Sequence, residues 1–318
     1  MNANEYKFFN KPFGALHWME TSYLKKEKKN DDDIIILLDP DMVLLQPITS
    51  VISIPKKDNN KNKEIITVEH GRPIAQKYGL GSRWIHFDLN KITGDENSPS
   101  KRVQSYEASM YYPAGPPYLA TAHDFYVIVQ HWTKFVHSVH LEYPHLLAEM
   151  YAYSIAAAHV NLPHVILPSL AVSNTLMSST EEAWSAIDNM DANQVCFPTT
   201  NDKEQYTPYI FHYCQRYMLG PNWFFGKRRI PKNFFSTCQD TYKLIDPPND
   251  LGTLYDYRIN PQKQRKDLYP SQVKREAYSL CTMITSMNEA TDFYHQHHCP
   301  TNFQPETLQL WDLTKKVT

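Results

Sequence analysis

A strand followed at once by two closely spaced carboxylates is the feature that most limits what this chain can fold into. Residues 34–38 are five consecutive apolar residues, a run typical of a strand covered on both faces of a sheet. Asp39, Pro40 and Asp41 follow directly. Ligands of open α/β sheets bind in the crevice where strands end, so we expect both acids at such an edge. Carboxylates on either side of a proline suit a Mg²⁺ or Mn²⁺ ion that also binds substrate phosphates.

The same three residues also fit an ordinary turn, in which the acids cap the following helix. The Asp-Pro-Asp spacing does not by itself distinguish a metal site from such a turn. The choice therefore depends on whether residues elsewhere in the sequence would complete a site.

Length, composition and net charge limit which classes of protein this chain can belong to. A chain of 318 residues with 42% hydrophobic and 21% charged residues can bury a substantial core. Its formal charge of −2 and the lack of a long basic stripe argue against nucleic-acid binding. The 21 Tyr, 14 Phe and 6 Trp could contact sugars or extended peptides, although large cores also use aromatic side chains. No stretch has the length and apolarity of a membrane span, and no signal peptide is recognisable.

Apolar periodicity predicts a mixture of helices and strands. Asn10 is expected to cap the first helix, and a capping box formed by Thr121 and Asp124 is expected to open another, whose apolar face serves as scaffold. The predicted helices cover residues 11–24, the segment after Thr121, residues 145–160 and residues 272–295. The predicted strands cover residues 34–38, 43–45, 65–68 and 208–213, with loops at 51–62 and 70–105.

The five cysteines, at positions 196, 214, 238, 281 and 299, lie in the C-terminal half. None forms a C-x-x-C pair, so a structural zinc site is not expected. In an oxidising compartment they would allow two disulfides and one free thiol. Their spacing leaves the connectivity open, with Cys281 and Cys299 as our first expected pair.

Glu149 lies among Leu, Met, Tyr and Ala residues in the first turns of the helix predicted over 145–160. A carboxylate in such surroundings is expected to be partly buried, and buried acids are normally paired or functional. Glu149 is therefore a candidate catalytic residue. The alternative is that it simply bonds a nearby Arg or Tyr.

Three further runs accompany the Asp-Pro-Asp segment in a fixed order. They are residues 10–20, which begin Asn-Lys-Pro-Phe-Gly, residues 146–153, which contain Glu-Met-Tyr-Ala-Tyr, and residues 210–213, Ile-Phe-His-Tyr. Together they resemble the plant and algal peptidyl glycosyltransferases, which comprise hydroxyproline O-arabinosyltransferases and peptidyl serine α-galactosyltransferases. The resemblance runs from about Tyr6 to about Lys232.

The resemblance implies an α/β fold of the GT-A-like class, a Rossmann-like mixed sheet flanked by helices. A partial glycosyltransferase domain would cover residues 1–232, and a C-terminal extension with the helix near 272–295 would cover residues 233–318. Members of the family have a further segment before the Asn-Lys-Pro block, which holds a membrane anchor and the first strands of the nucleotide-binding sheet. The chain is therefore expected to be N-terminally truncated relative to them.

The resemblance also implies a set of site residues. His212 would be a third metal ligand after Asp39 and Asp41, and imidazole suits Mn²⁺ better than Mg²⁺. Glu149 would stabilise the sugar in the transition state or orient the acceptor. The residues implied in donor binding are Asn10, Lys11, Gly115 and Lys227. For Gly115 a rigid turn is the alternative, and for Lys227 a solvated surface position.

The expected activity is metal-dependent transfer of arabinose or galactose from a UDP-sugar to a hydroxyproline or serine hydroxyl of a peptide, with retention of anomeric configuration. The cofactor would be Mn²⁺ or Mg²⁺, and the location the Golgi lumen of the secretory pathway. One alternative is a non-catalytic relative or fragment that binds peptide or glycan. A metal-dependent phosphohydrolase ranks third, because no further Asp/His cluster suggests a two-metal site.

Overall fold

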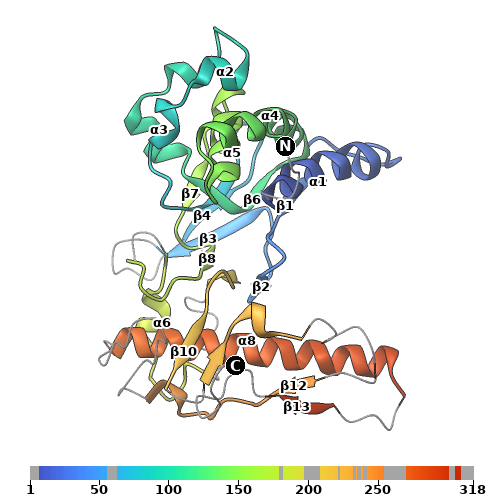
Figure 1. Ribbon diagram of the computed structural model, residues 1–318, viewed down its shortest axis with the longest axis vertical. Helices are drawn as coiled ribbons and strands as arrows, with labels where there is room; N and C mark the ends of the chain where they lie inside the picture. Colours follow the sequence, from blue (N-terminus) through green and yellow to red (C-terminus); the bar gives the residue numbers. More distant parts are fainter. Residues whose placement is uncertain are drawn as a thin grey trace. The chain divides into compact units, whose positions relative to one another are not determined.

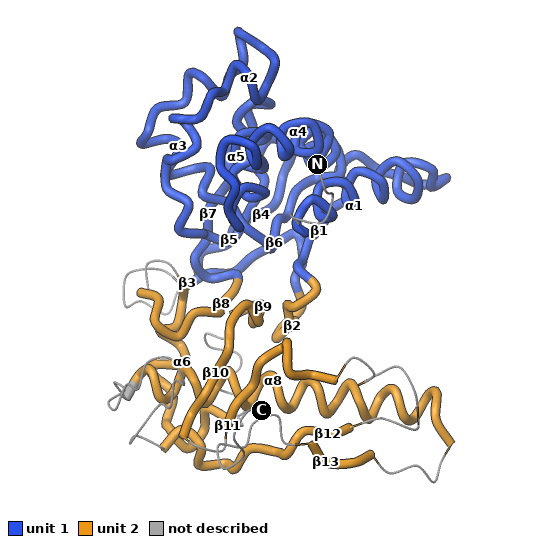
Figure 2. The backbone as a smooth tube through the Cα atoms, in the orientation of Figure 1, with its two compact units in different colours: residues 1–39, 48–170 blue, residues 40–47, 171–318 orange. Residues whose placement is uncertain are grey.

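A computed structural model describes residues 7–55, 63–178, 182–196, 208–220, 223–231, 234, 238, 242–253, 270–300 and 305–308. The chain forms two compact units. Unit 1 comprises residues 1–39 and 48–170, and unit 2 comprises residues 40–47 and 171–318 (Figure 2). Both units are mixed α/β, which confirms the predicted class at this level (Figure 1).

Unit 1 is built on a mixed four-stranded sheet with strand order β1-β6-β5-β7. The central strand β6 pairs antiparallel with β1 and β5, and β5 pairs parallel with β7. A separate antiparallel pair joins β3 and β4. The strands of unit 1 are β1 (Ile34–Leu37), β3 (Val51–Pro55), β4 (Lys63–Thr67), β5 (Ile74–Lys77), β6 (Ala114–Thr121) and β7 (Val165–Leu167).

The long helices of unit 1 pack against one another and against the sheet. Helix α4 contacts α1, α2 and α5, and both α4 and α5 contact β6. Trp132 of α4 is fully buried and its Nε1 donates to the carbonyl of Glu149, 2.9 Å away, which ties the start of α5 to α4. The helices are α1 (Asn10–Trp18), α2 (Leu89–Thr93), α3 (Ser105–Tyr111), α4 (Ala122–Glu142) and α5 (Ala148–His159), with short helical turns at Lys7–Phe9, Met19–Tyr23, Arg83–His86 and Pro99–Arg102.

The predicted helices of unit 1 are present, with corrected details. Thr121 caps α4, since its hydroxyl accepts from the amide of Asp124, which confirms one half of the predicted capping box; the Asp124 carboxylate contacts Gly71 and His70. Asn10 does not cap α1, because a helical turn at residues 7–9 runs directly into the helix and Phe9 precedes the first helical residue. Phe13, an apolar residue of α1, has 51% of its surface exposed. No helix in the described part of the chain combines the length and apolarity that a membrane crossing requires.

Three predictions about the strands and loops of unit 1 were wrong. Strand β1 is half-buried along its length, since it lies at the edge of the sheet and is not covered on both sides. Residues 70–105 are not an irregular loop, because they contain the interior strand β5 and several short helices. The loop predicted at 51–62 begins instead with strand β3, and residues 56–62 lie outside the described part of the chain.

Unit 2 contains a three-stranded mixed sheet with strand order β2-β9-β8, in which β9 pairs antiparallel with β2 and parallel with β8. Two strand pairs, antiparallel β10-β11 and parallel β12-β13, and the long helix α8 accompany it. The elements are β2 (Met42–Leu44), β8 (Ala171–Val172), α6 (Ser185–Asn189), β9 (Ile210–His212), β10 (Tyr217–Leu219), β11 (Trp223–Phe225), a helical turn at Lys227–Arg229, β12 (Tyr242–Leu244), a turn at Leu251–Thr253, α8 (Pro270–His298) and β13 (Glu306–Leu308).

Helix α8 confirms the helix predicted near 272–295, and it is part of the core of unit 2. The apolar residues at helical spacing along it are buried, namely Val273, Ala277, Leu280, Met283 and Ile284. They pack with side chains from before residue 232, including Val172, Phe211 and Tyr217. Because α8 and these strands share one core, residue 232 does not divide compact units, and the predicted extension at 233–318 is not separate from residues 171–231.

The cysteines form two disulfides and leave Cys214 as an exposed free thiol, as the count allowed. The predicted pairing of Cys281 with Cys299 was wrong. Cys281 pairs with Cys196, and Cys299 pairs with Cys238. Cys281 and Cys299 lie on and just beyond one helix, which holds them apart, whereas each meets a partner from an earlier segment.

Removing the Cys196–Cys281 disulfide should destabilise the protein markedly. The bond closes a loop with a sequence separation of 85, so its loss frees much chain entropy in the unfolded state. We expect the Cys196→Ala/Cys281→Ala variant to lose about 2–4 kcal/mol of unfolding free energy in urea titrations. Cys214→Ala is the matched control and should change by less than about 0.5 kcal/mol. Equal stability of the two variants would contradict this expectation.

Candidate functional site

The two carboxylates on either side of Pro40 belong to different units. Asp39 ends the first segment of unit 1, and Asp41 lies in the short segment of unit 2 that contains β2.

Asp39 lies in a group of charged side chains that we call the unit 1 cluster, formed by Lys11, Asp39 and Glu149. The Nζ atom of Lys11, from the first turn of α1, is 2.7 Å from Oδ1 of Asp39 and 3.4 Å from Oε2 of Glu149. Glu149 comes from the first turn of α5 and has 2% of its side chain exposed. The structure thus brings together three predicted site residues, and Lys11 is one partner of Glu149.

Burial and charge act in opposite directions on the pKa values of Glu149 and Lys11 in the unit 1 cluster. Burial raises the pKa of Glu149 to about 7, and although the nearby Asp39 adds to this, the Lys11 ammonium opposes it. Burial alone would lower the pKa of Lys11, but the charges of Glu149 and Asp39 more than offset it, so that this pKa lies above its ordinary value. Lys11 is therefore a cation at neutral pH, and Glu149 can take up or release a proton there.

Asp41 lies in a second group, the unit 2 cluster, formed by Asp41, His212 and Lys227. Pairing of β2 with β9 sets Met42 opposite His212, and the amide of Tyr213 donates to the carbonyl of Asp41, 2.8 Å away. As a result Nε2 of His212 is 3.4 Å from Oδ1 of Asp41, while the Nζ of Lys227 contacts Oδ2.

The charges of the unit 2 cluster favour an ionised Asp41. Burial would raise its pKa, but hydrogen bonds and charge from His212 and Lys227 outweigh burial and hold this pKa below its ordinary value. A carboxylate that stays ionised and an imidazole beside it are both suitable donors for a transition metal.

The spacing of Asp41 and His212 fits a shared ion. Two neighbouring ligands of an octahedral ion with bonds of about 2.1 Å lie about 3 Å apart. The 3.4 Å between Nε2 of His212 and Oδ1 of Asp41 is close to this value. An ion at this position would have to displace the ammonium group of Lys227 from Asp41, and a phosphate bound to the ion would give that ammonium a new partner.

Two of the residues implied in donor binding, Asn10 and Gly115, belong to neither cluster. Asn10 is an exposed first residue of α1. Gly115 is buried in β6, and a Cβ atom there would come within 2.2 Å of the Tyr78 ring. The close approach that Gly115 allows is therefore to Tyr78.

A pocket of about 690 Å³ opens in unit 1, away from the predicted site residues. None of these residues lines it. Its polar lining includes Arg72, Arg102, Glu107 and His164.

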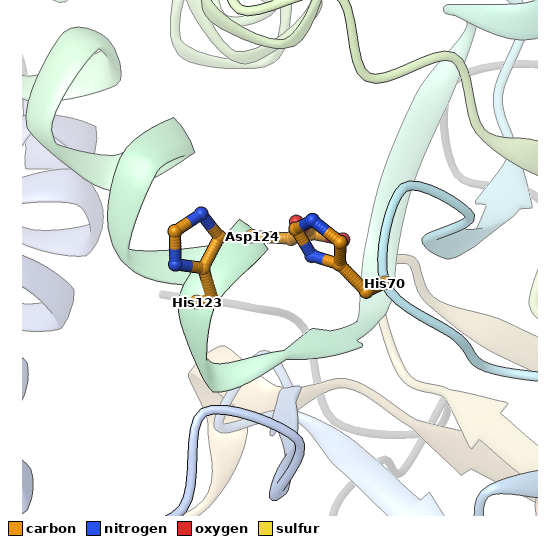
Figure 3. Close-up of side chains that lie close together, drawn as sticks. All are labelled: His70, His123 and Asp124. Carbon is orange, nitrogen blue, oxygen red and sulfur yellow. The ribbon is translucent and has the colours of Figure 1, made fainter.

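Sequence reasoning missed one group of candidate ligands, His70, His123 and Asp124, whose donor atoms all lie within 4.8 Å of one another (Figure 3). The sequence identified Asp124 only as part of a helix cap. His70 lies more than fifty residues earlier in the chain, so no local spacing pointed to this group.

Comparison of the chain with protein-family models, with curated proteins and with solved structures found no match.

Proposed function

We propose that this protein is a GT-A-like, metal-dependent glycosyltransferase that moves arabinose or galactose from a UDP-sugar to a serine or hydroxyproline hydroxyl of a peptide. One observation supports the proposal most directly. Residues predicted as site residues from distant runs of the sequence contact one another within each unit, in the unit 1 cluster and in the unit 2 cluster. Residues that serve only the core of the fold would not be expected to form two clusters of charged side chains. Each of these clusters includes one of the acids on either side of Pro40.

In this proposal Asp39 and Asp41 are ligands of a Mn²⁺ or Mg²⁺ ion, and His212 is a further ligand. The ion would act as a Lewis acid on the UDP diphosphate. Lys227, on a helical turn after β11, would exchange its contact with Asp41 for the diphosphate and stabilise the charge that develops on the leaving group.

Glu149 takes a different role from the catalytic one that the resemblance implied. With 2% of its side chain exposed, Glu149 has almost no surface to offer a sugar or an acceptor. Its carboxylate faces Lys11, which in turn contacts Asp39. We assign Glu149 as a positioning residue that holds the Lys11 ammonium beside Asp39.

The proposal includes a location in the secretory pathway, with the Golgi lumen as the expected compartment. Two disulfides in the described part of the chain support it, because such bonds persist in oxidising compartments.

The proposal is tested by release of UDP from UDP-galactose and UDP-arabinofuranose in the presence of serine or hydroxyproline peptides. We expect release with one donor and acceptor pair, dependent on Mn²⁺ and abolished by EDTA, with the sugar attached to the peptide by mass spectrometry. Absence of transfer for every pair, from a folded protein, would contradict the proposal.

A non-catalytic protein that binds peptide or glycan is the second candidate. The observation that favours it is that Lys11 and Lys227 already neutralise Asp39 and Asp41. In such a protein the acids would have a structural role, and peptide binding would persist without UDP or metal.

A further inference from the structure

A second group of potential ligands lies in unit 1, apart from the carboxylates next to Pro40. His123 and Asp124 are in the first turn of α4, and His70 lies on the facing turn between β4 and β5 (Figure 3). That turn is closed by a bridge between Glu69 and Arg72.

The Asp124 carboxylate is fixed from both sides. Asp124 is 1% exposed, and its Oδ2 accepts from the amide of Gly71, 2.7 Å away. Its Oδ1 faces His70, whose Nδ1 is 2.7 Å away. A buried carboxylate with one oxygen held by the backbone offers the other oxygen in a defined direction.

The imidazole rings of His70 and His123 both lie near this oxygen of Asp124. The ring centroids of His70 and His123 are 4.9 Å apart, with the rings at 76° to each other. One donor atom from each of the three residues lies within 4.8 Å of the others. The side chain of His70 is 62% exposed, and His123 is also exposed, so both rings can turn by small side-chain rotations.

We propose that His70, His123 and Asp124 form a site for a zinc-type divalent transition metal, with water completing the coordination. Two imidazoles and one carboxylate are a donor set typical of open zinc sites. Ligands of a tetrahedral zinc ion lie about 3.3 Å apart, so the rings need to turn only enough to separate His70 from Asp124 slightly and to bring His123 closer. Mg²⁺ and Ca²⁺ prefer all-oxygen surroundings and are poor candidates here.

A bound ion would join the turn at His70 to the start of α4. Gly71 has φ of 77°, a left-handed conformation that glycine adopts readily, and its amide contacts Asp124. The ion would bind His70 on the turn and both His123 and Asp124 on α4, in addition to the hydrogen bond from Gly71, so it should stabilise unit 1 independently of any UDP-sugar activity.

The test uses zinc binding and thermal unfolding of the full chain. The histidines at 295, 297 and 298 could bind zinc by themselves, so we use the His295→Ala/His297→Ala/His298→Ala variant as background. Asp41→Asn is added to this background, because it removes the metal site proposed beside Pro40. In the resulting variant we expect one zinc ion bound by calorimetry and a zinc-dependent rise in Tm that Mg²⁺ and Ca²⁺ do not produce. His70→Ala and His123→Ala should each weaken zinc binding by about tenfold or more.

His17→Ala provides the matched control, because His17 is an exposed histidine on α1, and this change should leave zinc affinity unaltered. Asp124→Asn should weaken binding as the histidine variants do, and the latter suffice if Asp124→Asn fails to fold. Unchanged affinity in the His70→Ala/His123→Ala variant, or an equal loss in His17→Ala, would overturn the proposal. Neither outcome depends on glycosyltransferase activity, so this site can fail while the proposed function stands.

Discussion

Replacing Asp41 by Asn should lower kcat/KM for Mn²⁺-dependent sugar transfer by about a thousandfold, and replacing Asp39 by Asn should have an effect of the same order. Asparagine keeps the shape of the side chain but removes the charge that binds a divalent cation. A metal that acts as Lewis acid contributes several kcal/mol to the stability of the transition state, and about 1.4 kcal/mol corresponds to a factor of ten.

The matched control for Asp41→Asn is Asp292→Asn. Asp292 is also a unit 2 carboxylate paired with a lysine, since Nζ of Lys243 lies 2.6 Å from its Oδ1. This variant should retain full turnover.

The folding of Asp41→Asn has to be checked separately. The pKa of Asp41 is lower in the folded state than its ordinary value of 3.8, so the ionised side chain stabilises the fold above that pH and loses this effect in acid. Circular dichroism should therefore show a folded variant that is modestly less stable at neutral pH. Unchanged turnover in both Asp39→Asn and Asp41→Asn would refute the metal assignment.

The second large effect is expected from Lys11→Met. This change removes the cation that Asp39 and Glu149 share, and breaking a buried ion pair by removing one partner typically costs about 3 kcal/mol or more. We expect a loss of this order in the unfolding free energy at pH 8, measured by urea titration in EDTA.

The loss in Lys11→Met should depend on pH. The folded-state pKa of Glu149, about 7, lies above its ordinary value of 4.5, so ionisation of Glu149 weakens the fold as pH rises from about 4.5 to 7. At pH 5 Glu149 is protonated and needs the lysine less, so the loss should be clearly smaller there than at pH 8. Without the Lys11 charge the pKa of Glu149 should rise further, which moves the pH-dependent change to higher pH.

Two variants check this explanation. Lys11→Met/Glu149→Gln should recover most of the stability at pH 8, because the buried charge is removed together with its partner. Lys243→Met removes the ammonium from the more exposed pair with Asp292 and should change stability by less than about 1 kcal/mol. A loss that is the same at pH 5 and pH 8, or that persists in the double variant, would show that Lys11 acts through packing and not through charge.

Features with a strong local signal could be predicted from the sequence. The face of α4 that contains Phe125, Ile128 and Trp132 is buried as its helical spacing predicted, and so are the apolar positions of α8. Glu149 was expected to be partly buried because its neighbours in the helix are apolar, and the structure confirms this.

Features that depend on tertiary contacts could not be predicted. Strand β5 has only one β-branched residue, Ile74, and lies between glycines, so it gave no strand pattern although it occupies the interior of the sheet. The disulfide partners lie 61 and 85 residues apart, and the contact between Lys11 and Glu149 spans 138 residues. No periodicity connects positions so far apart, because only tertiary packing brings such side chains together. For Lys11 and Glu149 it is the packing of α1, α4 and α5, and for the disulfides it is the fold of unit 2.

The central claim is that a cation held by the carboxylates next to Pro40 binds the diphosphate of a nucleotide, and calorimetric titration with UDP tests it most directly. The account predicts one UDP bound per chain in the presence of Mn²⁺, with binding lost in EDTA and in Asp39→Asn and Asp41→Asn. Absence of UDP binding with Mn²⁺, or equal binding with and without the metal, would contradict it.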